Sequence, residues 1–317
     1  MNADPSFRRT VSVPDAPRAA DFSAADAPDP SGGEPRYRAM LEQDRERWWK
    51  SENWDKWAAH YVSEYPRGRF ILRTLRRYAP GFRPEGARVL DVGCGDAGVP
   101  IAFAEAGARC AGMEPDARSL ERGRLRAEEH GVRVDLRQGF AESLPFDDGA
   151  FDLVVLDNVL EHVQDRNRTL AEIHRVLRPG GLLYLVTPKP FAAYSVWSDP
   201  HYAMAGLVLM PRPVQVWYFE RVRGGGKGNY GVGVIPTRRG VLRMLRRHGF
   251  RSLVPPRELW MHYLREKITG PTSLSTGLKR RVGRWVAERP WVTEAAPLQW
   301  AWDVGIGSNF FIARREG

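Results

Sequence analysis

Three glycines and two acidic residues between positions 91 and 114 have types and spacing that suit ligand binding. Gly93, Gly95 and Gly98 form a Gly-x-Gly-x-x-Gly pattern directly after a short apolar run. Such glycines let the backbone approach a ligand closely, and the following helix N-terminus presents free N–H groups. By itself this pattern also predicts a dinucleotide site, because the same loop binds the pyrophosphate of dinucleotides.

The two acidic residues favour a different ligand. Asp91 lies two residues before the first glycine, where a carboxylate is awkward in a dehydrogenase strand but suits a ligand with an ammonium group. S-adenosylmethionine carries an ammonium and a sulfonium. Glu114 ends the next apolar run, where an acidic residue accepts hydrogen bonds from ribose hydroxyls. The alternative for Glu114 is a turn-forming acid before Pro115.

The elements that must position these residues follow from the alternation of short apolar runs with amphipathic stretches, which predicts βαβ units and a parallel sheet. Strands are expected at 88–92, 109–113, 133–136, 151–156 and 182–186. Helices are expected at 99–106, 116–130 and 166–177, the last ended by a Pro-Gly-Gly sequence at 179–181. A helix at 237–248 and a strand at 309–313 complete the expected set.

Six ordered blocks of sequence in this region share the content and spacing of one enzyme family: residues 89–95, 113–115, 139–146, 151–155, 158–162 and 172–181. They resemble the class I S-adenosylmethionine-dependent methyltransferases, in the small-molecule, methyltransferase type 11-like branch. The resemblance covers about a third of the chain. It implies a Rossmann-like α/β core with a mostly parallel seven-stranded sheet, helices on both faces, N-terminal helices and an inserted cap.

The resemblance also implies a set of cofactor-binding residues near the carboxyl ends of the strands: Asp91, Gly93, Cys94, Gly95, Glu114, Phe140, Ala141, Glu142 and Asp157. Asp91 and Asp157 face the methionine part of S-adenosylmethionine, Glu114 holds the ribose, and the 140–142 turn borders the adenine. Phe140 departs from the family, which usually has Asp there as an acceptor for the adenine amino group. Either Glu142 substitutes for that acid or Phe140 stacks on the ring.

Histidines are the candidates for a catalytic base. Methyl transfer from a sulfonium is an in-line displacement, so the enzyme mainly positions and desolvates the reactants. A hydroxyl acceptor also benefits from a general base with a pKa near neutral. Of the seven histidines, His201 in the irregular stretch after the fifth strand and His162 after the fourth are the two catalytic candidates. The alternative role of His162 is packing, and no metal site is predicted.

Composition divides the chain into five segments. Residues 1–36 are rich in Pro, Ala, Asp and Ser and predict a disordered tail. Residues 37–83 form an N-terminal helical segment and 84–189 the cofactor-binding core. Residues 190–235 are a Pro-, Gly- and aromatic-rich insertion assigned to the acceptor site, and 236–317 complete the core with a basic helical segment. The two cysteines predict reduced thiols. We expect a cytoplasmic protein, because no apolar run is long enough to span a bilayer and the N-terminus lacks a signal peptide.

The net charge of +10 originates in one segment, because residues 237–290 hold 14 Lys or Arg and only 3 Asp or Glu. A basic face attracts an anionic acceptor, a phospholipid surface or RNA, although a solvated helical face explains the same charge.

We therefore expect methyl transfer to a hydroxyl or amine of a small molecule or sugar, anionic or lipid-linked acceptors included, in specialised-metabolite or cell-surface glycan biosynthesis. Peripheral attachment to the inner membrane face fits such an acceptor. The first alternative is an RNA methyltransferase that uses the basic segment, with Trp260, Tyr263 and Trp285 available to stack on bases. The second is a non-catalytic scaffold. The presence of Asp91 and Glu114 disfavours it, because a protein that does not bind the cofactor has no need for these two acids.

Overall fold

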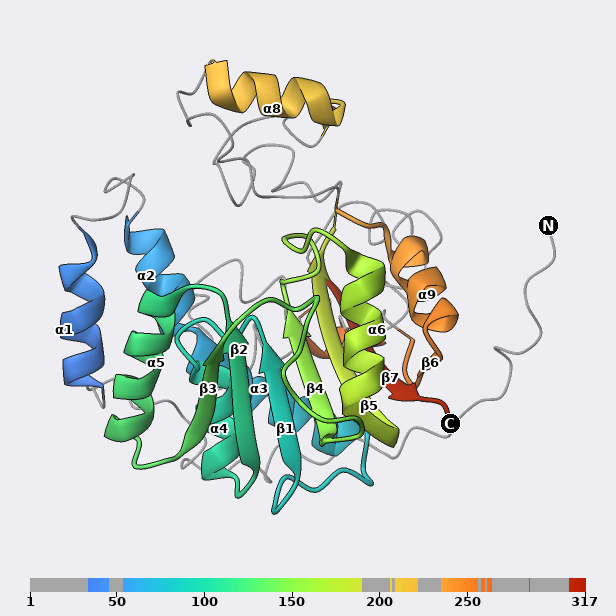
Figure 1. Cartoon of the computed structure of the whole chain (residues 1–317), viewed down its shortest axis with the longest axis horizontal. Helices are drawn as coiled ribbons and strands as arrows, with labels where there is room; N and C mark the ends of the chain where they lie inside the picture. Colours follow the sequence, from blue (N-terminus) through green and yellow to red (C-terminus); the bar gives the residue numbers. More distant parts are fainter. Residues whose placement is uncertain are drawn as a thin grey trace.

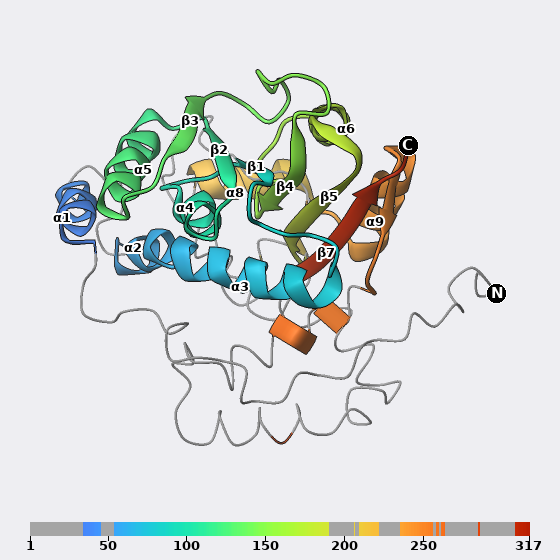
Figure 2. The ribbon, with the colours of Figure 1, turned by 90° about the horizontal axis from the view of Figure 1, so that it is seen from below.

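The computed structural model describes residues 34–45, 54–189, 206, 209–221, 235–255, 258–259, 261–263, 285 and 308–317. These residues build a sheet of seven strands with helices on both faces (Figures 1 and 2). The strands are β1 (Arg88–Val92), β2 (Arg109–Glu114), β3 (Val134–Gln138), β4 (Phe151–Asp157), β5 (Leu177–Pro188), β6 (Phe250–Ser252) and β7 (Ser308–Arg315). Their order is β3-β2-β1-β4-β5-β7-β6. Strand β7 runs antiparallel to both of its neighbours, β5 and β6, and the other adjacent pairs are parallel. The predicted fold class is confirmed.

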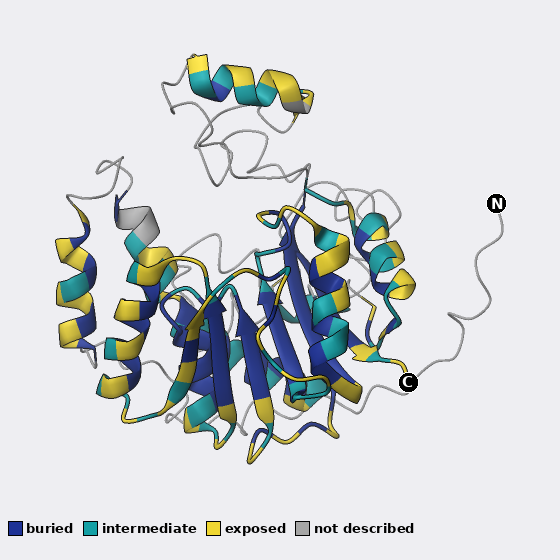
Figure 3. Ribbon diagram, viewed as in Figure 1, coloured by how far each residue is buried: buried dark blue, intermediate teal, exposed yellow. Residues whose placement is uncertain are grey.

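The helices of the described residues are α1 (Pro35–Gln43), α2 (Trp54–Val62), α3 (Glu64–Tyr78), α4 (Gly98–Glu105), α5 (Ala117–Glu129), α6 (Arg166–Val176), α8 (Arg212–Arg221) and α9 (Arg238–Arg247). Helices α3 and α4 cover one sheet face, and α6 and α9 cover the other (Figure 2). The strands between them are buried along most of their length (Figure 3). Strands buried on both faces read as continuous apolar runs, which is why β1, β2 and β4 were recognisable in the sequence.

Side-chain alternation along β4 decides which layer its final residue meets. Leu153 and Val155 pack in the cluster that includes α3, whereas Val154 and Leu156 pack in the cluster that includes α6. Because successive side chains of a strand point to opposite faces, Asp157 at the end of β4 belongs to the α3 face. The same alternation in β1 puts Asp91 on that face, since its neighbours Leu90 and Val92 lie in the other cluster.

The structure differs from the sequence-based expectation at several boundaries. Helix α6 ends at Val176 and β5 begins at once, so the Pro-Gly-Gly sequence lies within a strand whose pairing with β4 is irregular. Strand β6 was not predicted, because three residues are too short to show a periodic pattern. Helix α1 begins at Pro35, inside the range predicted as a disordered tail. The rest of that tail and most of the predicted insertion lie outside the described residues.

Buried ion pairs attach the N-terminal helices to α5. Arg126 of α5 is 1% exposed, and its Nε lies 2.6 Å from Oε1 of Glu34, just before α1. Arg122, one turn earlier, pairs with Asp44 at 2.6 Å and with Asp96 at 2.8 Å. Buried charges are retained in proteins when they are paired in this way. The start of the described chain is therefore held by electrostatics as well as by apolar packing.

His130 should make stability depend on pH. Its Nδ1 lies 2.8 Å from Glu105 and its Nε2 lies 2.9 Å from Glu34. These two hydrogen bonds raise the pKa of His130 to about 9. A raised histidine pKa stabilises the folded state below the unfolded value of roughly 6.5, and this contribution is lost as pH rises through the folded value. After allowance for solvent screening, we expect a loss of about 1–2 kcal/mol between pH 6 and pH 9.5.

Urea unfolding at those two pH values tests this expectation. His130→Asn keeps a polar side chain but cannot titrate, so the variant should show a smaller difference between the two pH values than the native protein does. An equal difference in both proteins would show that His130 does not carry the effect.

Candidate active site

Three acidic residues meet where the chain order of the sheet reverses. Strand β1 lies between β2 and β4, and ligands of open α/β sheets bind at the carboxyl ends of the strands beside such a reversal. Asp91 lies in β1, Glu114 ends β2 and Asp157 ends β4. The structure thus brings together the three carboxylates that the sequence predicted to contact the cofactor.

Asp91 is a buried carboxylate without local compensation. It is 3% exposed, and its side chain makes no hydrogen bond or ion pair with the other described residues. Burial raises the pKa of Asp91 well above its ordinary value, and the charges of Asp157 and Glu114 raise it further, whereas Arg67 lowers it. A buried charge normally has a partner, so a site that keeps this carboxylate suits a cationic ligand.

Asp157 has a partner from the N-terminal helical segment. Nη1 of Arg67, on α3, lies 3.4 Å from Oδ2 of Asp157, and Nδ2 of Asn158 donates to the other oxygen at 2.8 Å. Burial raises the pKa of Asp157, and the Arg67 guanidinium opposes that shift. Asn158 has φ +56°, a left-handed conformation that Asn tolerates better than most residues, and this places its amide beside Asp157. The end of β4 is therefore a fixed polar turn.

Glu114 holds the glycine loop in place. Its Oε2 accepts a hydrogen bond from the Gly95 N–H at 3.1 Å, and its Oε1 accepts one from the Asp116 N–H at 3.1 Å. Burial raises the pKa of Glu114. Gly95 has φ +53° and Gly93 has φ +75°, backbone conformations that residues other than glycine rarely adopt. The positive φ values and the hydrogen bonds to Glu114 together define the shape of the loop.

Glu64 fastens the same loop from the opposite side. Its Oε2 accepts a hydrogen bond from the Gly98 N–H at 3.3 Å, at the first residue of α4. A Cβ atom at Gly95 would lie 2.3 Å from Oε1 of Glu64, so a larger residue would force the two apart. Burial and the nearby Asp96 raise the pKa of Glu64 well above its usual value. The site therefore contains a fourth acidic group.

Sequence reasoning missed Glu64 and Arg67, which were treated as part of helices that merely pack on the core. They lie three residues apart, on neighbouring positions of one helix face. Gly68 follows them, and a Cβ there would lie 2.8 Å from Cβ of Ala102 on α4, so α3 and α4 pack closely at this point. The sequence signal that could have indicated a functional helix face was an acid, a base and a glycine at positions 64, 67 and 68 of one amphipathic helix.

The other predicted cofactor residues have different surroundings. Cys94 is buried in the small core cluster below the loop, so its thiol packs and its backbone borders the site. Phe140 is 66% exposed, whereas Ala141 is buried. Oε1 of Glu142 accepts hydrogen bonds from the N–H groups of Gln164 at 2.8 Å and Asp165 at 3.3 Å. The roles of Glu142 and Phe140 toward the adenine stay predictions.

Of the two candidate bases, only His162 lies among the described residues. His162 is exposed, in the loop between β4 and α6. Its backbone N–H donates to the Val159 carbonyl oxygen at 2.8 Å. His201 lies outside the described residues. Their catalytic roles stay predictions. No cluster of three potential metal ligands occurs among the residues that the structure describes, and within the same residues no helix is long and apolar enough to cross a bilayer.

Comparison with known proteins gives one family match. Residues 90–185 match the family model described as "Methyltransferase domain". The match spans the loop after β1, the acidic ends of β2 and β4, and β5 as far as Leu185.

Curated relatives are similar over part of their length. A ubiquinone biosynthesis O-methyltransferase of Methylocella silvestris is 33% identical over 169 residues, which are 50% of this chain and 65% of the relative. An uncharacterized methyltransferase of Mycobacterium sp. strain JLS is 42% identical over 130 residues, 41% of this chain and 47% of the relative. The chain thus spans about half to two thirds of these relatives. A solved S-adenosylmethionine-dependent methyltransferase from Mesorhizobium loti has a TM-score of 0.48 and 21% identity, covering 78% of this chain and 98% of the other.

Proposed function

We propose that the chain is an S-adenosylmethionine-dependent methyltransferase acting on a hydroxyl or amine of a small molecule or sugar, because residues 90–185 match the methyltransferase-domain family model. The single observation that carries this proposal is the buried, uncompensated carboxylate of Asp91 beside the glycine loop. The family match supports S-adenosylmethionine as the cofactor, in agreement with the sequence-based prediction.

The charges of the site fit this cofactor. The carboxylates of Glu64, Asp91 and Asp157 act on the guanidinium of Arg67, and Glu114 adds a fourth carboxylate that acts on Asp91. Arg126 of α5 lies 3.7 Å from Glu64 and offsets part of this negative charge. S-adenosylmethionine has an ammonium and a sulfonium but only one carboxylate, so its net charge complements the acidic excess. Arg67 is the group suited to the cofactor's carboxylate, because a guanidinium binds carboxylates in a planar, bidentate geometry.

Each residue then has a role in holding the reactants. Asp91 and Asp157 stabilise the cationic methionine end, and Glu114 accepts hydrogen bonds from the ribose while it keeps the Gly95 N–H in place. Phe140 offers its exposed ring to the adenine. Bound S-adenosylmethionine supplies an electrophilic methyl group on a sulfonium. The protein's contribution is orientation and exclusion of water, with His162 or His201 as the proposed base.

A small-molecule acceptor fits the described residues better than RNA does. Tyr263, one of the aromatic residues proposed to stack on bases, packs against Phe310 with ring centroids 4.8 Å apart and against Phe70 at 5.6 Å. The Tyr263 ring therefore packs against core residues and is less available to stack on a base. The Methylocella relative and similar curated proteins are named as O-methyltransferases of ubiquinone biosynthesis, and these names support the same class of acceptor.

Two measurements on the full chain test the proposal. Calorimetry should detect one S-adenosylmethionine bound per chain. Incubation of cell extract with methyl-labelled cofactor should transfer the label into the small-molecule fraction. Label in RNA alone would support the RNA alternative, and absence of cofactor binding would reject every catalytic proposal made here.

A further inference from the structure

A second concave site lies at the opposite end of the parallel strands from Asp91 and Glu114. Its volume is about 630 Å³, within the range of small-molecule sites. It lies at the amino-terminal ends of β1, β2 and β3, where the chain enters the sheet. Its lining includes three arginines, Arg88, Arg109 and Arg133, together with Asp135 and two phenylalanine rings. We call it the arginine cavity.

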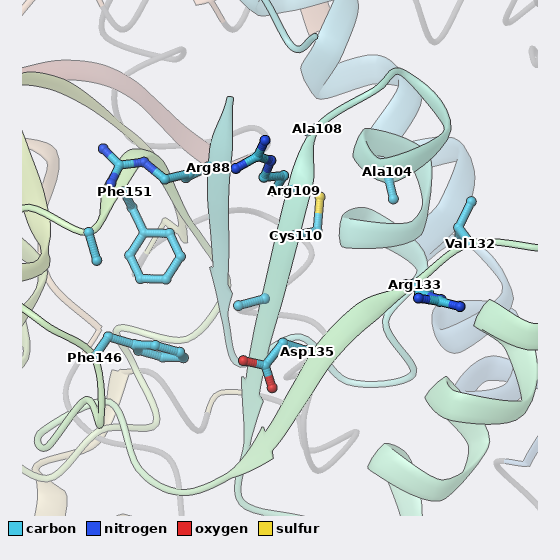
Figure 4. Close-up of a pocket in the computed structure, with 12 residues that line it drawn as sticks. Arg88, Ala104, Ala108, Arg109, Cys110, Val132, Arg133, Asp135, Phe146 and Phe151 are labelled. Carbon is cyan, nitrogen blue, oxygen red and sulfur yellow. The ribbon is translucent and has the colours of Figure 1, made fainter. Parts of the chain in front are cut away.

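The sheet register places the three arginines side by side. Arg88 of β1 pairs directly with Arg109 of β2, and Cys110 pairs with Val134, so Arg109 and Arg133 are neighbours one residue earlier. Figure 4 shows Arg88 and Arg109 at the starts of adjacent strands, with Arg133 farther along the same edge. Like charges in adjacent positions of a sheet repel one another. The three side chains are exposed, so water screens much of this repulsion, and a bound anion would reduce it further.

The protein neutralises only part of this charge. Arg88 lies 3.4 Å from Asp152. The carboxylate of Asp135, which also lines the cavity, is bound by Arg137 at 2.7 Å. Within the described part of the chain, the guanidinium groups of Arg109 and Arg133 make no hydrogen bond and no ion pair. Two guanidinium groups thus remain for an anion.

An apolar wall borders the charged row. The rings of Phe146 and Phe151 lie 5.0 Å apart, edge to face, on one side of the cavity (Figure 4). The guanidinium of Arg137 covers the Phe146 ring at 4.6 Å and adds a further positive charge beside it. A ligand with an anionic head and a flat apolar body would contact both surfaces.

We propose that the arginine cavity binds a small organic phosphate, with its phosphate on Arg109 and Arg133 and its apolar part against Phe146. Guanidinium groups bind phosphate oxygens through paired N–H donors, and two of them match a dianionic monoester. The site is separate from the proposed cofactor site, because about 10 Å of β1 separates Arg88 from Asp91. The proposal therefore does not depend on the proposed methyl transfer.

Calorimetric titration of the full chain with phenyl phosphate tests this site. Phenyl phosphate should bind once per chain and more tightly than inorganic phosphate, since only the ester reaches the phenylalanine wall. The double variant Arg109→Ala/Arg133→Ala should weaken binding at least about tenfold. The double variant Arg246→Ala/Arg247→Ala removes the same two charges from exposed positions on α9 and should change the affinity less than about twofold. Excess S-adenosylmethionine should not displace the probe.

Four results would overturn the proposal. One is an unchanged affinity in the Arg109→Ala/Arg133→Ala variant, and another is an equal loss in the Arg246→Ala/Arg247→Ala control, which would indicate attraction by overall charge. The third is displacement by S-adenosylmethionine, which would place the probe in the cofactor site. Binding of single-stranded RNA through both arginines, without binding of phenyl phosphate, would also reject the small-molecule assignment. Unaltered thermal unfolding of the Arg109→Ala/Arg133→Ala variant is the control for folding.

Discussion

Replacing Asp91 by Asn is expected to weaken S-adenosylmethionine binding by about 100-fold without destabilising the protein. The carboxylate is buried, the described residues give it no hydrogen-bond partner, and Arg67 offsets only part of the effect of burial, so we expect a ligand cation to be its main partner. Because the pKa of Asp91 is raised in the folded state, ionisation of this carboxyl opposes folding at any pH above the pKa that it has in the unfolded chain. The neutral amide removes that cost, so the thermal midpoint at pH 8 should stay constant or rise while affinity falls.

Calorimetry with S-adenosylmethionine, beside a thermal unfolding scan, measures both effects. Asp147→Asn, the same change at an exposed turn, is the matched control and should alter neither. In the native protein, affinity should also fall as pH decreases, because protons compete with the cationic ligand for Asp91 and Asp157, whose pKa values are raised. Asp91→Asn should flatten that profile. Retained affinity in Asp91→Asn would remove the observation on which the proposed function rests.

Replacing Arg126 by Met is expected to lower the free energy of unfolding by about 3–5 kcal/mol. Arg126 pairs with Glu34 at 2.6 Å, lies 3.7 Å from Glu64, and donates to the carbonyl oxygens of Tyr61 and Val62 at 3.1 and 3.2 Å. Methionine fills a similar volume but removes the guanidinium beside two buried carboxylates, so Glu34 keeps only His130 as a partner and Glu64 only the charge of Arg67. The loss should therefore come from uncompensated charge rather than from a cavity.

Urea unfolding measures the loss, and a second substitution identifies its cause. Glu34→Gln in the Arg126→Met background removes one of the uncompensated charges and should restore part of the stability. Arg124→Met, at an exposed position on the same helix, should change stability by less than about 1 kcal/mol. Equal losses in Arg124→Met and Arg126→Met would mean that the buried network has no special importance.

The cofactor edge of the sheet could be derived from the sequence because two local patterns coincide there. Parallel strands buried on both faces give apolar runs, and those runs fix where β1, β2 and β4 end. Asp91, Glu114 and Asp157 lie at those ends, so their proximity followed once a parallel sheet was predicted. The glycines with positive φ were equally local, since a turn alone requires them.

The contribution of the N-terminal helices was not derivable in this way. Glu64 and Arg67 reach the site only because α3 docks against α4, and that contact depends on residues more than thirty positions away. The short strand β6 and the start of α1 were missed for a related reason. A strand of three residues has no period to detect, and α1 is held by ion pairs with α5 that no local pattern predicts.

The sequence by itself therefore determined the sheet, the glycine loop after β1 and the acidic residues at the strand ends, because each follows from a short periodic pattern or a backbone requirement. Only the tertiary structure decided which charges are compensated. Arg67 reaches Asp157, whereas Asp91 has no such partner among the described residues. The same holds for Arg109 and Arg133, which are 24 positions apart in sequence and become neighbours only through strand register. Register and helix docking, not residue type, place these charges.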